Sequence, residues 1–134
     1  MQVLYAWELR GGVEPLRAVE RELITADVPR RDVEVRRYTA RLLEAIEADG
    51  FEVDARLEAH AANWRLSRMA AVDRNILRIA AVEMLHFDDI PLRVSLQEAI
   101  RLAEWFGTED SQRFVNGVLD ALLHELEPER QSDA

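Results

Sequence analysis

The segment from about Ser67 to Phe87 limits the possible folds of this chain more than any other. On a helical wheel its apolar residues surround most of the axis: Val72, Ile76, Leu77, Ile79, Ala80, Ala81, Val82, Met84 and Leu85. The polar residues keep only a narrow strip, formed by Arg74, Asn75, Arg78 and His86. A helix that is apolar almost all round has to be covered on several sides. The segment therefore predicts a central helix with other helices packed around it.

Apolar residues in the rest of the chain also recur at three- and four-residue spacing, and no segment alternates with period two for long enough to make a strand. Glycine and proline fall between the periodic segments, as expected of helix ends. We predict an all-α fold, a compact bundle of six or seven helices. The helices expected besides the central one are residues 2–10, a segment between Pro15 and Pro29, one from near Asp32 to a cap at Gly50, a short one ending near Asn63, and residues 94–106 and 111–126.

Length and composition favour a single domain without disulfides. A chain of 134 residues suits one domain, predicted at residues 1–127, with a polar flexible tail at 128–134. The chain has no cysteine, which fits a reducing cytoplasm. No apolar run approaches the roughly 20 residues that cross a bilayer, so no membrane partner is expected.

The charge balance argues against a broad nucleic-acid surface but leaves room for a local one. The net charge of −9 repels phosphates at long range. All 17 basic residues are arginines, whose planar guanidinium group suits phosphate recognition. A GC-rich coding sequence would produce the same bias.

The sequence contains no arrangement typical of catalysis or metal binding. Glu83 and His86 form one Glu-x-x-His, half of the motif found in di-metal bundles, and the second copy is missing. Glu83 lies inside the apolar arc of the central helix, so we expect it to be buried with its partner on a different helix. Phosphate-binding glycine loops and nucleophile elbows are absent. We therefore predict a binding module with no cofactor and no metal rather than an enzyme.

The last predicted helix carries an unexplained glycine. Gly117 lies in mid-helix on the polar face beside Arg113 and Asn116, where glycine costs about 1 kcal/mol relative to alanine. Either a neighbouring helix packs closely there or a ligand approaches the backbone. Phe114 is suited either to the core or to stacking on a base. The same choice between core and interface, including the interface of a homodimer, is open for Trp64, Phe87, Trp105 and Phe106.

Four stretches of sequence follow one another in a distinctive order. They are Leu-Tyr-Ala-Trp-Glu at 4–8, Asp-Arg-Asn-Ile-Leu-Arg-Ile-Ala at 73–80, Ile-Pro-Leu-Arg-Val-Ser-Leu-Gln-Glu-Ala-Ile-Arg-Leu-Ala-Glu at 90–104 and Phe-Gly-Thr-Glu-Asp-Ser-Gln-Arg-Phe-Val-Asn-Gly-Val-Leu-Asp at 106–120. Over essentially the whole chain this series resembles the NusB family of bacterial transcription antitermination factors. The resemblance implies two small sub-bundles that share the long central helix.

The resemblance also implies a function. Proteins of this kind pair with the ribosomal small-subunit protein that doubles as NusE, bind the boxA element of nascent RNA, and join an antitermination complex on RNA polymerase during ribosomal RNA transcription. Carried over to this sequence, the partner-facing residues are Tyr5, Asp73 and Arg74. The RNA-facing residues are Gln2, Asp110, Gln112, Arg113, Phe114 and Asn116.

The sequence departs from the family pattern at its start. The family normally has an arginine-rich segment before its Gln-x-Leu-Tyr motif, whereas this sequence begins inside that motif, and its first helix has no cap ahead of it. Either the start of the sequence is misplaced or the segment is absent; if it is absent, RNA binding should be weaker, because affinity rises with the number of phosphates neutralised. The alternative is therefore a protein-only scaffold that binds NusE, or a homodimer. NusB-like domains also precede some ribosomal RNA cytosine methyltransferases, but nothing here could bind S-adenosylmethionine.

Overall fold

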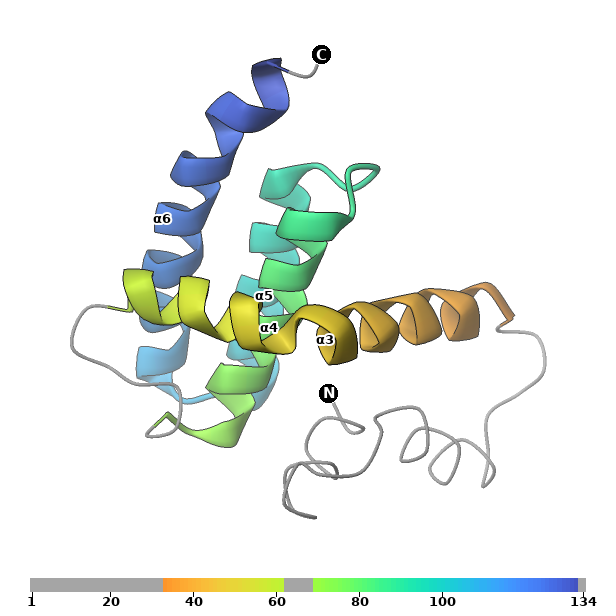
Figure 1. Cartoon of the computed structure of the whole chain (residues 1–134). Helices are drawn as coiled ribbons and strands as arrows, with labels where there is room; N and C mark the ends of the chain where they lie inside the picture. Colours follow the sequence, from red (N-terminus) through yellow and green to blue (C-terminus); the bar gives the residue numbers. More distant parts are fainter. Residues whose placement is uncertain (1–32, 62–68, 133–134) are drawn as a thin grey trace.

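The computed structural model describes residues 33–61 and 69–132, and this part of the chain is helical (Figure 1). It consists of α3 (Val33–His60), α4 (Ala71–His86), α5 (Leu92–Phe106) and α6 (Glu109–Ser132), with no strand in the described ranges. The predicted all-α fold is confirmed. The helices expected before residue 33 lie outside the described residues.

The predicted helix count is wrong within residues 33–61, where one helix replaces two. Gly50 was expected to end a helix, but α3 continues through it to His60. Ile46, Val53 and Leu57 lie on one face of α3 and are all buried, so packing holds the helix together on both sides of the glycine. Burial of these three apolar side chains stabilises the helix by more than the cost of about 1 kcal/mol for a helical glycine.

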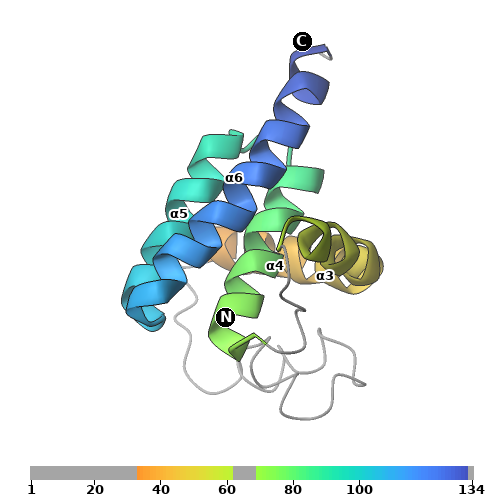
Figure 2. The same ribbon diagram turned by 90° about the vertical axis from the view of Figure 1, so that its left-hand side faces the viewer.

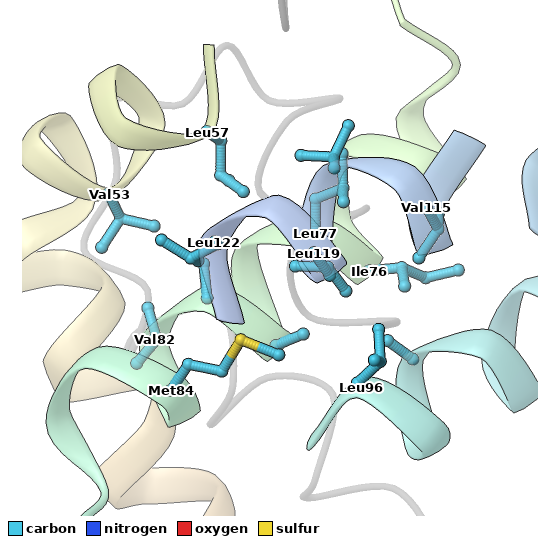
Figure 3. Packing of buried hydrophobic residues seen from close by; sticks show 14 of the residues in the cluster. Val53, Leu57, Ile76, Leu77, Val82, Met84, Leu96, Val115, Leu119 and Leu122 are labelled. Atoms are coloured by element: carbon cyan, nitrogen blue, oxygen red, sulfur yellow. The ribbon is translucent and has the colours of Figure 1, made fainter. Parts of the chain in front are cut away.

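The central position of α4 is confirmed, because α4 packs against α3, α5 and α6. Ile76, Leu77 and Val82 are fully buried on it. Figure 3 shows these side chains meeting Leu119 and Leu122 of α6, Leu96 of α5, and Val53 and Leu57 of α3. The core of the described residues therefore lies where α4 is covered on three sides.

α4, α5 and α6 pack against one another as a three-helix bundle, and α3 crosses it. In both views α4, α5 and α6 alternate in direction, and Figure 2 shows α3 nearly end-on beside α4. The start of α4, the end of α5 and the start of α6 consequently lie at the same end of this bundle. That end carries residues 73–74 and 105–117, which include most of the predicted site.

Part of the polar strip of α4 faces α3, with Asn75 buried and Arg78 half-buried, while His86 at its end is exposed. Arg78 donates from Nε and Nη2 to the two carboxylate oxygens of Asp54, both at 2.9 Å. His86 Nε2 lies 3.3 Å from Asp49 Oδ2. Asn75 of the polar strip is fully buried, and its Oδ1 accepts from Arg78 Nη1 at 3.4 Å. Arg78 and His86 therefore face carboxylates of α3.

Two helix ends differ from the prediction. α5 begins at Leu92 instead of Val94, directly after Pro91, whose carbonyl accepts from the Val94 N–H at 3.0 Å. α6 was expected to end near Leu126, but it runs through Pro128 to Ser132. Proline lacks the N–H that would bond to the His124 carbonyl, but one missing bond near the end of a long helix does not stop it. The division between a domain at 1–127 and a tail stays a prediction.

Candidate nucleic-acid interface

A tight corner fixes the start of α6 relative to the end of α5. A Cβ atom added at Gly107 would lie 2.5 Å from Ser111 Cβ and 2.8 Å from the Ala103 carbonyl oxygen, so only glycine fits. The backbone N–H of Thr108 donates to Ser111 Oγ at 2.9 Å, and the Ser111 N–H donates to the Thr108 carbonyl at 3.0 Å. This reciprocal pair caps α6. The helix therefore starts at Glu109, two residues before the predicted start.

The outer face of α6 carries the residues predicted to face RNA. Asp110, Arg113 and Asn116 are exposed, and Gln112 is half-buried. Phe114 is half-buried and packs against the core, which leaves part of its side chain accessible. The structure thus brings these five residues together along the first two turns of one helix.

Gly117 lies on the same exposed face, and the structure argues against one explanation of it. A Cβ atom at Gly117 would meet nothing within 4 Å, so close packing by the described helices does not require the glycine. The approach of a ligand, the other explanation, is compatible with this geometry.

Arg113 differs from most of the described arginines in its charge environment, a property that it shares with the exposed Arg37 of α3. Ion pairs with carboxylates engage Arg41, Arg56, Arg78, Arg93 and Arg101. Arg113 is exposed and pairs with no carboxylate in the described part of the chain. Its positive charge is therefore available to a phosphate.

The start of α4 holds two of the predicted partner-facing residues. Asp73 is half-buried, and its Oδ1 is enclosed without a hydrogen-bond donor among the described residues. Arg74 is also half-buried, and its Nη1 donates to the Met69 carbonyl at 3.1 Å. The predicted residues Gln2 and Tyr5 lie outside the described residues, so their positions relative to this end stay a prediction.

The aromatic residues whose environment was left open divide between core and surface. Phe87 is buried at 2% exposure, stacks edge to face with Tyr38 and lies under Arg41, whose Cζ is 4.0 Å from the ring centroid. Trp105 and Phe106 are 65% and 59% exposed. They are off the buried stripe of α5, formed by Leu92, Leu96, Ala99 and Ala103. Trp64 lies outside the described residues.

Glu83 is half-buried, as the sequence suggested, but it faces a like charge. Its pKa is raised from 4.5 to about 7, mainly by burial and then by the negative charge of Glu98 on α5, while the hydroxyl of Ser95 on α5 has a smaller opposite effect. The groups acting on Glu83 do come from a different helix, as expected. Among residues 33–61 and 69–132, no three histidine or acidic side chains gather into a possible metal site.

The geometry defines an all-helical binding module with an exposed polar edge on α6. Comparison with known proteins identifies it further: the chain belongs to the NusB family, whose sequence profile matches residues 1–124. This is a family of transcription antitermination factors, not of enzymes. The family resemblance predicted from the sequence is confirmed.

Individual relatives agree with this assignment. The transcription antitermination protein NusB of Chloroherpeton thalassium is 40% identical over 126 residues, which cover 94% of this chain. The match spans only 58% of that relative's length.

In the described part of this chain, no helix has both the length and the apolar character needed to span a bilayer.

Two solved structures share the fold. The NusB of T. maritima superposes with a TM-score of 0.84 at 32% identity, covering 98% of this chain and 90% of that one. A chain in the crystal structure of a plectonemic RNA supercoil superposes with a TM-score of 0.78 at 27% identity, covering 92% of this chain and 87% of that one.

Proposed function

We propose that this chain is an RNA-binding antitermination adaptor of the cytoplasm. In this proposal it pairs with the ribosomal protein NusE, and the pair binds boxA RNA and joins the antitermination complex on RNA polymerase during ribosomal RNA transcription. Family membership supports the general role. The observation that carries the RNA-binding part is the exposed Arg113 at the centre of the predicted edge, which has no carboxylate partner among residues 33–61 and 69–132.

The neighbours of Arg113 suit single-stranded RNA. A phosphate can bind its guanidinium group in a planar, two-point contact. Asn116, one turn further on, offers donors and acceptors to a base edge, and the accessible side of Phe114 offers a stacking surface. Unpaired bases can turn outward to reach such groups, whereas duplex bases cannot.

The partner would approach the start of α4. Asp73 and Arg74 there are both half-buried, so part of each side chain is accessible to a second protein. This position lies at the same end of the three-helix bundle as the start of α6. A protein bound there would stand beside the RNA edge, and both could contact one RNA strand.

The test is a titration of fluorescent boxA-like RNA at several salt concentrations, with Arg113→Ala and Arg93→Ala as matched variants. Both arginines are exposed, but Arg93 pairs with Glu127 at 3.3 Å and lies on α5. Losing one phosphate contact lowers the salt slope by about 0.7 for a single strand. We expect that change for Arg113→Ala only. Equal slopes in both variants and the unmodified protein would contradict the proposal.

The second candidate is a protein-only scaffold that binds NusE without RNA. The net charge of −9 and the pairing of Arg41, Arg56, Arg78, Arg93 and Arg101 with carboxylates favour it. In that case NusE would bind normally, while boxA-like and scrambled RNA would bind equally weakly at every salt concentration.

A further inference from the structure

We propose that Trp105 and Phe106 form a base-stacking platform that extends the RNA-facing edge of α6 across the corner onto α5. This inference rests on the proposed function, because it names a second part of the same RNA site. It concerns residues that the family resemblance did not assign to RNA.

The two rings are unusually open for large aromatic side chains. Trp105 is 65% exposed and Phe106 is 59% exposed. Their ring centroids lie 6.4 Å apart with the planes at 87°, so each ring holds the other in an edge-to-face pair. A base can stack on either exposed face, and such stacking tolerates any base because each has a π-face.

The corner at Gly107 fixes this pair relative to the edge on α6. The Gly107 N–H donates to the Ala103 carbonyl at 2.9 Å, and the contacts between Thr108 and Ser111 start α6 directly afterwards. Along the chain, the aromatic pair therefore directly precedes the rigid two-residue link at 107–108, and Asp110 and Arg113 follow this link at the start of α6. A strand held at Arg113 by a phosphate could place a neighbouring base on the pair.

RNA suits this surface better than a second copy of the chain. The two rings expose on the order of 300 Å² together, well below the roughly 800 Å² that each partner buries in a stable protein interface. Exposed carboxylates at Glu104, Glu109 and Asp110 interrupt any larger apolar patch. They would repel phosphates, but the base itself is uncharged, so stacking brings no negative charge onto the rings.

The experiment compares Trp105→Ala, Trp105→Phe and the control Phe51→Ala in binding to boxA-like RNA. Phe51 is also an exposed aromatic residue, at 92%, but it lies on α3. Stacking on one base changes affinity by about 5-fold to 150-fold. We expect a loss in that range for Trp105→Ala, little loss for Trp105→Phe, and none for Phe51→Ala. Circular dichroism checks that each variant is folded.

A scan with abasic nucleotides identifies the stacked base. When the stacked base is already missing, Trp105→Ala should cause no further loss of RNA affinity. When any other base is missing, Trp105→Ala should lower the affinity as much as it does with intact RNA. If Trp105→Ala binds RNA normally while Arg113→Ala does not, the platform is wrong and the proposed function stands. If no variant changes RNA binding, both are wrong. If Trp105→Ala instead changes only the sedimentation of the free protein, a second copy covers the pair and the platform is wrong.

Discussion

Replacing Glu83 by glutamine should stabilise the protein more at pH 8 than at pH 5. The folded state raises the pKa of Glu83 from 4.5 to about 7, mainly by burial and then by the charge of Glu98. The folded protein therefore keeps this proton to higher pH than the unfolded chain does. Unfolding then releases a proton between about pH 4.5 and 7, and stability falls as the pH rises through that window.

The size of the effect follows from the pKa difference. A difference of this size corresponds to about 3 kcal/mol of unfolding free energy once the pH is above 7. Because Glu83 is half-buried and water screens part of its charge, we expect Glu83→Gln to raise the free energy of unfolding by about 1–2 kcal/mol at pH 8. Glutamine keeps the shape and removes the charge. Its amide can also donate to Ser95 Oγ, which is buried without a hydrogen bond of ordinary geometry in the described structure.

Urea unfolding followed by circular dichroism at pH 5 and pH 8 measures this difference. Glu104→Gln is the matched control, since Glu104 is an exposed glutamate on α5. We expect the control to change stability equally at both pH values. A gain from Glu83→Gln that is no larger at pH 8 than at pH 5 would refute the reasoning about burial.

Two glycine substitutions test the helix and corner geometry. Gly117→Ala and Gly50→Ala should each raise the free energy of unfolding by about 0.5–1 kcal/mol, because a Cβ atom at either position meets nothing within 4 Å. Only Gly117→Ala should also weaken RNA binding. Unchanged RNA binding by Gly117→Ala would show that no ligand approaches the helix there. Gly107→Ala should lower stability by about 1–3 kcal/mol in a urea titration, because the added atom would overlap Ser111 and the Ala103 carbonyl. A neutral result at Gly107 would mean that the corner can open without cost.

The central helix could be predicted because its pattern allows one arrangement only. The apolar residues of α4 surround most of its axis, and three helices of the structure pack against α4. The same pattern could not show that part of its polar strip is covered as well. Asn75 is buried because Asp54 and Arg78 pair across the interface between α3 and α4, and that depends on residues more than twenty positions apart.

Helical spacing gives only part of the core face of α6. Val118, Leu122 and Leu126 lie at four-residue spacing and are buried. The structure also buries Val115, Leu119 and Leu123, because α6 packs against α3, α4 and α5 and needs a wider apolar arc than one stripe. Helical periodicity gives the direction of a buried face, but the number of neighbouring helices sets its width.

The sequence predicted which residues form the candidate site, but it did not predict their exposure or their charge partners. Sequence spacing places Arg113, Asn116 and Gly117 on one face of a helix. It could not show that Arg113 lacks the carboxylate partner that most described arginines have, nor that Trp105 is exposed. Both properties depend on which side chains the fold brings near them.

The account as a whole depends on the chain binding RNA together with its proposed partner. The most direct measurement is the dissociation constant for boxA-like RNA at one fixed salt concentration, with and without NusE. We expect weak binding by the chain alone and much tighter, salt-sensitive binding with NusE present, because the partner would stand beside the α6 edge. An affinity that does not change when NusE is added, with its binding to the chain verified separately, would contradict the account.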